Sequence, residues 1–101
     1  MLLDEHIKKL AEIEKTGKAI ARGGGITVSV RPKDKSTHAL PHMHIWYSGG
    51  EASVDLDGNI LANSNVRYDK IAEVHKWSQK HRLTITNMYN GLIPIDYIED
   101  L

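Results

Sequence analysis

The segment 42–62 constrains the fold most, because polar and apolar residues alternate on both sides of a glycine pair. The run His42-Met43-His44-Ile45-Trp46-Tyr47 precedes Gly49-Gly50, and Glu51-Ala52-Ser53-Val54-Asp55 follows it. A period of two is typical of a half-buried strand, and Gly-Gly between two such runs is typical of a tight hairpin turn. We therefore expect an antiparallel hairpin with one buried face and one exposed face.

The position of the turn predicts which side chains share a face. With Gly49-Gly50 as the turn, His44 lies opposite Asp55 and His42 lies opposite Asp57. A slip of one residue would place the histidines opposite apolar residues, so the burial pattern favours this register. The other face would form the core, and it would hold Met43, Ile45, Tyr47, Ala52, Val54 and Leu56.

Elements are also expected on the N-terminal side of the hairpin. Apolar residues spaced by three and four predict an amphipathic N-terminal helix over residues 1–22, which Gly23-Gly24-Gly25 would end. Such a helix could also serve as a homodimer surface. The alternating segment Ile26–Val30 predicts a strand.

The C-terminal part is expected to be mainly helical. After a short strand at 60–62, Asn63-Ser64-Asn65 offers capping side chains for a helix that begins near Val66 or Arg67. The segment 83–86 fits a strand or a continued helix, and Pro94 could start a last helical turn. The buried residues of these helices would be Ile71, Val74, Trp77, Ile95, Ile98 and Leu101.

The expected fold class is α+β in a single domain. We expect a small antiparallel sheet of three to four strands, with the N-terminal helix and one or two C-terminal helices packed on it. The domain would comprise the N-terminal helix at 1–22, a β-meander at 25–62 and a helical C-terminal part at 65–101.

The histidine strand is the main candidate for chemistry, because His42 and His44 share one face. A carboxylate beside an imidazole favours general acid–base catalysis. Two same-face imidazoles can also bind a divalent metal such as zinc, manganese or nickel, with Asp55 or His38 completing the ligand set. In a third interpretation, cross-strand His–Asp pairs only stabilise the hairpin. The sequence leaves all three open.

Anion or partner binding is the second candidate, through Arg31, Lys33, Lys35 and Trp46, whose ring is either covered by a helix or available for stacking. With Arg82, the same cations could bind nucleic acid. However, 13 Lys and Arg balance 13 Asp and Glu, whereas a dedicated nucleic-acid-binding domain is usually clearly basic.

Composition and the N-terminus exclude several classes. The chain has no cysteine, which excludes disulfides, thiolate metal sites and cysteine nucleophiles. Membrane spans need roughly 18 consecutive apolar residues, and the sequence holds no such stretch. Asp4 and Glu5 lie where a signal peptide would be basic and then apolar. We expect a cytoplasmic protein without a membrane association.

The histidine strand also carries a family resemblance. The segments Leu40-Pro41-His42-Met43-His44-Ile45-Trp46-Tyr47, Gly58-Asn59-Ile60-Leu61, Lys76-Trp77 and Lys80-His81-Arg82 resemble the domain of unknown function DUF4160, a small bacterial family with a Pro-His-x-His core. The likeness covers the chain from about residue 25. Departures are Met43 for the usual Phe, Tyr89 for the usual Trp, and a Thr-rich segment after His81.

The resemblance implies a compact α+β domain associated with two-gene modules similar to toxin–antitoxin systems. It brings no established activity, and residue by residue it carries over only His42, His44 and His81. The leading functional expectation is therefore an interaction module that binds a partner protein in a toxin–antitoxin or phage-defence setting. The alternative is a metal-assisted nuclease or phosphodiesterase, with His42, His44 and His81 as catalytic residues.

Overall fold

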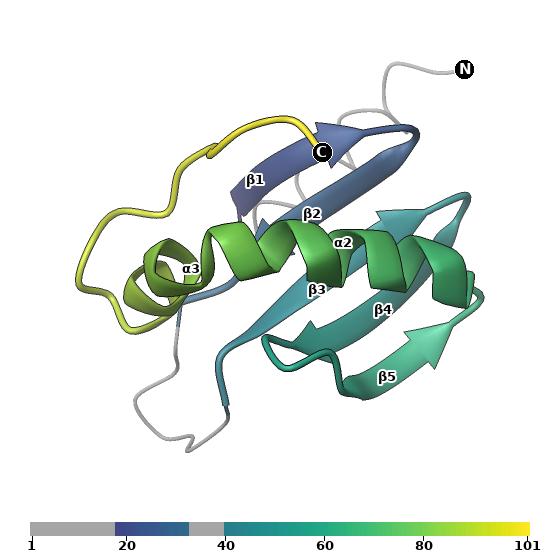
Figure 1. The fold of residues 1–101 in the computed structure, drawn as a ribbon, viewed down its shortest axis with the longest axis horizontal. Coiled ribbons are helices and arrows are strands. Elements are labelled where there is room, and N and C mark those ends of the chain that lie inside the picture. The colour runs from purple at the N-terminus through teal and green to yellow at the C-terminus, as the bar shows by residue number, and fades with distance from the viewer. Residues whose placement is uncertain (1–17, 33–39) are drawn as a thin grey trace, which may run out of the picture.

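The computed structural model describes residues 18–32 and 40–101, which form a five-stranded antiparallel sheet and two helices (Figure 1). The strands follow one another in space as they do in sequence, so the sheet is a meander. Its elements are β1 (Lys18–Gly23), β2 (Ile26–Val30), β3 (His42–Tyr47), β4 (Gly50–Asp55), β5 (Ile60–Ser64), α2 (Tyr68–Lys80) and α3 (Arg82–Tyr89).

The first strand corrects the expected N-terminal helix and the expected three to four strands. Residues 18–22 belong to β1, which pairs with β2; the rest of the predicted helix lies outside the described residues. Gly24 and Gly25 adopt φ angles of 56° and 82°, the left-handed conformation of a tight hairpin turn. Glycine suits a helix end and a primed turn equally, so the triplet did not distinguish the two structures.

The β3–β4 hairpin confirms the predicted faces but corrects the predicted pairs. Its turn is Ser48-Gly49, with φ angles of 48° and 81°, and Gly50 begins β4. A Cβ at Gly50 would lie 2.5 Å from the Ser64 carbonyl oxygen, so this glycine is required inside the strand. Consequently, His42 faces Asp55 and His44 faces Ser53, a shift of two residues that leaves every side chain on its expected face.

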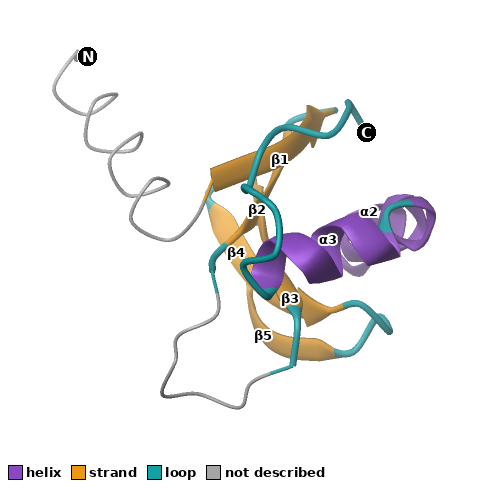
Figure 2. Cartoon of the chain, turned by 90° about the vertical axis from the view of Figure 1, so that its left-hand side faces the viewer, coloured by secondary structure: helices purple, strands orange, loops and turns teal. Residues whose placement is uncertain are grey.

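One face of the sheet packs against both helices, as Figure 2 shows. The predicted apolar face of β3 and β4 is buried there: Met43, Ile45 and Val54 are fully buried, and Ala52 and Leu56 nearly so. From α2, the expected stripe of Ile71, Val74 and Trp77 meets it, and from α3 come Ile85, Met88 and Tyr89. No described helix covers the opposite face.

The helices resolve one open question and correct one detail. Residues 82–89 are helical, so the strand alternative for 83–86 is wrong. The start of α2 has no side-chain cap, because Asn63 instead bonds the backbone N–H and carbonyl of Val66, at 3.0 Å each. Among the described residues, no helix is long and apolar enough to cross a membrane.

The C-terminal tail is extended rather than the expected last helical turn. Its Ile95, Ile98 and Leu101 still pack on the core, as their spacing suggested. The tail runs along β1, where the Ile98 amide donates to the Ile20 carbonyl at 2.8 Å and the Leu101 amide donates to the Arg22 carbonyl at 3.0 Å. These bonds to the sheet edge replace those that a helical turn would have made internally.

Candidate functional site

The face of the sheet opposite the helices carries a cluster of polar side chains, which we call the histidine face. It consists of His42, His44 and Trp46 on β3 and of Glu51 and Ser53 on β4. All five are half-buried. The period of two that buries the alternate residues against α2 and α3 is what brings these five together.

The two imidazole rings are in contact. Their centroids lie 5.1 Å apart in an edge-to-face arrangement. His42 is fixed further by its Nδ1–H, which donates to the Leu40 carbonyl at 2.9 Å, and by the Tyr89 ring of α3 at 5.6 Å. With the proton on Nδ1, the Nε2 atom of neutral His42 has a free electron pair.

His44 is held from β4. Its Nδ1 lies 3.3 Å from the Ser53 hydroxyl and 3.4 Å from Glu51 Oε1, and its side chain is 13% exposed. A carboxylate beside Nδ1 favours the tautomer with the proton on that atom. Nε2 of His44 is buried and has no hydrogen-bond partner among the described residues.

Burial lowers the pKa of His44, because the charged imidazolium loses solvation there. The neighbouring His42 acts in the same direction, Glu51 opposes both, and the positive charge of Arg31 lowers the pKa further. His44 is therefore a neutral imidazole at neutral pH, and its Nε2 is an electron-pair donor.

Asp55, the expected metal ligand, is committed to the turn between β4 and β5. Its Oδ1 accepts the amides of Asp57 at 2.9 Å and Asn59 at 2.8 Å, and its Oδ2 accepts the Asn59 side-chain amide at 3.0 Å. Burial alone would raise the pKa of Asp55, but the bonds from Asn59 and Asp57 outweigh it and hold the pKa below its usual value. Its carboxylate serves the chain's own backbone.

The third expected catalytic histidine, His81, makes its contacts elsewhere. It lies between α2 and α3, where its Nε2 is 2.7 Å from Glu99 Oε1 and its ring lies 4.8 Å from the Trp77 ring. The contacts of His42 and His44 involve neither of these residues. His81 therefore ties the tail to the helices.

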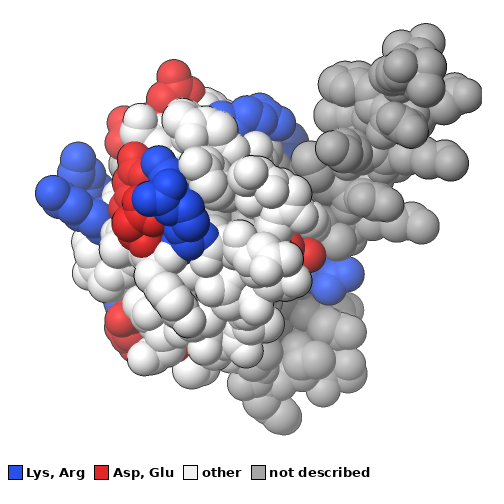
Figure 3. Space-filling model, turned by 90° about the vertical axis from the view of Figure 1, so that its right-hand side faces the viewer, with Lys and Arg blue, Asp and Glu red and all other residues white. Residues whose placement is uncertain are grey.

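The structure separates the expected cationic residues. Arg31 lies near enough to His44 to influence its pKa, while Lys33 and Lys35 lie outside the described residues. Arg82 is bound to Asp57 at 2.8 Å and to the Leu56 carbonyl at 3.0 Å. On the side of the molecule in Figure 3, basic and acidic side chains lie next to each other, not in a field of one sign.

Two further expectations concern the position of Trp46 and the ligands of a metal ion. Trp46 lies on the histidine face, and its Nε1 donates to the buried Ser29 hydroxyl at 3.4 Å. Within 18–32 and 40–101, no three His, Asp or Glu side chains are grouped so that they alone could hold a metal ion. His38, the other candidate ligand, lies outside the described residues.

Sequence reasoning missed Glu51 as the carboxylate partner of a histidine. The predicted register placed Asp55 opposite His44, whereas the observed register places Ser53 there and brings Glu51 within reach from the neighbouring position. The sequence does hold a signal for Glu51. A two-residue turn at Ser48-Gly49 pairs Trp46 directly with Glu51, five residues later, on the face that carries the histidines.

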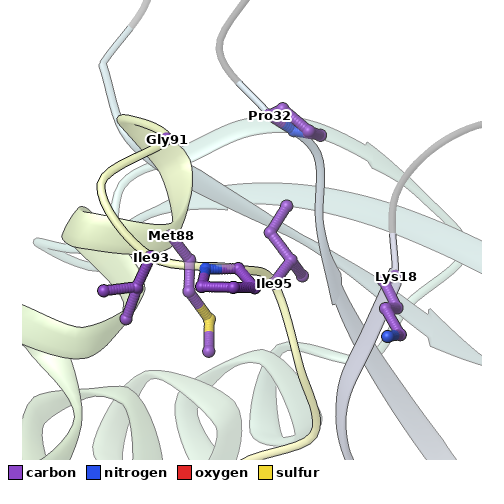
Figure 4. A pocket seen from close by; sticks show the side chains of 7 residues that line it. Lys18, Pro32, Met88, Gly91, Ile93 and Ile95 are labelled. Atoms are coloured by element: carbon purple, nitrogen blue, oxygen red, sulfur yellow. The ribbon is translucent and has the colours of Figure 1, made fainter.

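A separate hollow of about 380 Å³ lies away from these histidines (Figure 4). It is mostly apolar, and Lys18 is the one charged side chain among the described residues that line it; Lys18 lies 3.9 Å from Asp96. Its lining comes from β1, the end of β2, the end of α3 and the tail: Lys18, Pro32, Met88, Gly91, Ile93, Pro94 and Ile95.

Comparison with known proteins matches the chain to a family model. The family model for the domain of unknown function DUF4160 matches residues 25–90, which is well over half of the chain and includes the histidine face, α2 and α3. No curated protein and no solved structure matches the chain.

Proposed function

We propose that this chain, which belongs to the DUF4160 family, is a small cytoplasmic interaction module that binds a partner protein by accepting one of its strands. The observation that carries the proposal is the edge strand β5. All five of its residues are exposed, and it contains neither a charged residue nor a proline.

Edge strands usually carry such features, because unpaired backbone groups recruit strands from other chains. Against such pairing, β5 has only its short length and one irregularity in its register with β4. Ala62 pairs with Ser53 and Ile60 pairs with Val54, so Leu61 between them has no partner in β4. The Leu61 side chain is 53% exposed and that of Ile60 is 39% exposed. The strand therefore offers backbone hydrogen bonds and two apolar contacts together.

The opposite edge of the sheet, β1, is covered by the C-terminal tail. There, the tail occupies β1 through the amides of Ile98 and Leu101, and the Arg22 amide donates to the Tyr97 hydroxyl at 3.1 Å. No described segment takes the equivalent place beside β5, which is the last strand of the sheet. This difference favours β5 as the edge that pairs with another protein.

The chemistry of β5 specifies the partner. An added strand gains affinity from main-chain hydrogen bonds and specificity from alternate side chains. Because β5 is uncharged, the complementary segment would be extended and apolar. The family resemblance suggests the second protein of a two-gene module, in a toxin–antitoxin or phage-defence setting, as the first partner to test.

The test uses the full chain co-expressed with the product of the neighbouring gene. We expect a complex on size exclusion with light scattering, and we expect Leu61→Lys to prevent it, since a charge on an edge strand opposes strand addition. The matched control is Leu83→Lys. Leu83 is 74% exposed on α3, so its replacement changes charge and hydrophobicity equally but away from the edge.

Three results would contradict the proposal: no complex, a complex that survives Leu61→Lys, or a complex that Leu83→Lys disrupts equally. If Leu61→Lys instead abolished self-association, the occupant of β5 would be a second copy, and the partner proposed here would be wrong. Circular dichroism of both variants establishes that the fold is retained.

A second candidate function is supported by one contact. The Glu51 carboxylate lies beside Nδ1 of His44, as in an oriented general base, which favours a nuclease or phosphodiesterase acting on this face. In that case, His44→Ala would abolish phosphodiester hydrolysis while the thermal midpoint hardly moved. Activity that persisted in His44→Ala would contradict this function.

A further inference from the structure

Nε2 of His44 is the feature of the histidine face that hydrogen bonding leaves unexplained. The atom is buried, and among the described residues nothing bonds to it. An unsatisfied buried polar atom costs free energy and calls for a ligand, a water molecule or an ion. The other ring nitrogen, Nδ1, lies within reach of two polar side chains, those of Ser53 and Glu51.

His42 has the same arrangement. Its Nδ1–H is used by the Leu40 carbonyl, so its Nε2 is also the electron-pair donor of the ring. The two rings are in contact, with centroids 5.1 Å apart. Metal-binding histidines typically donate their second N–H to a carbonyl or a carboxylate, which fixes the tautomer and orients the ring. Here the Leu40 carbonyl accepts from Nδ1 of His42, and the Glu51 carboxylate lies beside Nδ1 of His44.

We propose that His42 and His44 form a two-imidazole binding site for a divalent transition metal ion that prefers nitrogen ligands, such as Zn²⁺, Co²⁺ or Ni²⁺. Both Nε2 atoms are the ligands, and water molecules fill the remaining positions. Glu51 is a positioning residue that holds His44 in the ligand tautomer. Asp55 takes no part, because its oxygens are used by Asn59 and Asp57.

Two charged side chains act on His44, the Glu51 carboxylate and the more weakly acting Arg31, and the stronger influence of Glu51 favours a cation. Glu51 is the acidic group that contacts His44, with its Oε1 atom 3.4 Å from Nδ1. Since Nε2 of His44 is buried, an ion reaches it only when a neighbouring side chain moves.

The test is titration of the metal-free full chain with ZnCl₂ in a calorimeter and with CoCl₂ in a spectrophotometer. We expect one ion per chain, with a cobalt spectrum showing nitrogen ligation. In ¹⁵N spectra of the imidazoles, Zn²⁺ should shift the Nε2 resonances of His42 and His44 and leave their Nδ1 resonances protonated. This reading needs no variant and no enzymatic activity.

Variants then assign the ligands. His42→Ala and His44→Ala should each weaken binding at least about tenfold, and Glu51→Ala should weaken it about tenfold, as expected for a residue that supports a ligand. The matched control is His75→Ala. His75 is bonded through Nε2 to Gln79 at 2.8 Å on α2, so its loss should leave metal binding unchanged.

Three outcomes would overturn the site: no binding to the wild-type chain, binding that persists in the His42→Ala/His44→Ala double variant, or shifts at Nδ1 instead of Nε2. Should His44→Ala fail to fold, His42→Asn and the wild-type spectra still decide the question. Complex formation through β5 is measured separately, so failure of this site is distinguishable from failure of the interaction proposed above.

Discussion

His42 and Asp55 are direct cross-strand partners, yet their side chains bond in different directions. The imidazole of His42 donates back to the Leu40 carbonyl, whereas the Asp55 carboxylate accepts three bonds from Asp57 and Asn59. The sequence paired His44 with Asp55, whereas the observed register pairs His42 with Asp55 and the side chains of this pair are divided. Its histidine belongs to the histidine face, and its carboxylate belongs to the β4–β5 turn.

Replacement of Asp55 should mainly affect folding. Asp55→Ala removes the acceptor of three hydrogen bonds at a residue that is 4% exposed, and bonds to a charged group contribute about 1.5–3 kcal/mol each. Since the freed amides of the turn regain water, we expect a loss of about 3 kcal/mol in the free energy of unfolding, measured by urea denaturation.

The control for this prediction is Asp57→Ala. Asp57 is exposed and bound to Arg82, and exposed ion pairs contribute about 0–1 kcal/mol. If the two variants were equally destabilised, the Asp55 bonds would not stabilise the turn as argued here.

The same carboxylate predicts how stability depends on pH. Folding lowers the pKa of the Asp55 carboxyl from its usual value of 3.8. When the pH falls to this range, the carboxyl is therefore protonated more readily in the unfolded chain than in the folded chain. Its contribution is therefore complete above about pH 4 and is lost as the pH falls through the folded pKa. Asp55→Asn should flatten this part of the stability curve in denaturation series at several pH values. An unchanged acid slope in Asp55→Asn would contradict the assignment.

The faces of the β3–β4 hairpin could be predicted from the sequence, but its register could not. Alternating polarity predicts only on which face of the sheet a side chain lies, and a shift of two residues leaves every side chain on the same face. The turn was decided by Gly50, which must lack a side chain because the Ser64 carbonyl lies against it. That contact is with another strand, so no local pattern reveals it.

The N-terminal strand could not be predicted for a related reason. Lys18–Gly23 has no clear period of two, because Ala19, Ile20 and Ala21 are all buried and the pairing with β2 is irregular at Ile20. Burial on both sides depends on β2 and on the tail, which contacts Ile20 from the other end of the chain. Similarly, Glu51 joined the candidate site only once the register was known.

Gly50 gives a direct test of the register. Gly50→Ala would place a methyl group 2.5 Å from the Ser64 carbonyl oxygen and 2.8 Å from the Asn65 carbonyl carbon, so we expect a loss of about 3 kcal/mol, at the upper end for an overpacked site. Chemical denaturation measures it.

The control for the register test is Gly49→Asn. Gly49 has a φ of 81° and open space around it, and asparagine tolerates the left-handed conformation, so the cost should stay below about 1 kcal/mol. The opposite order of the two variants would place the turn at Gly49-Gly50 instead.

The tail provides the last prediction, because it occupies the β1 edge of the sheet. Removal of residues 95–101 eliminates the backbone bonds to Ile20 and Arg22 and the apolar contacts of Ile95, Ile98 and Leu101. Each fully buried side chain of this size contributes about 1.5–3 kcal/mol, and these partly buried ones contribute less, so we expect a clear fall in the thermal midpoint.

The exposed β1 edge should also make the shortened chain associate with itself, which sedimentation velocity would detect as a concentration-dependent increase in mass. Leu92→Asp is the control, since Leu92 is 72% exposed and its replacement leaves the tail in place. A shortened chain that stayed as stable and as monomeric as this control would mean that the tail does not protect the edge. In that event, the contrast between β1 and β5 would no longer support β5 as the edge that binds a partner.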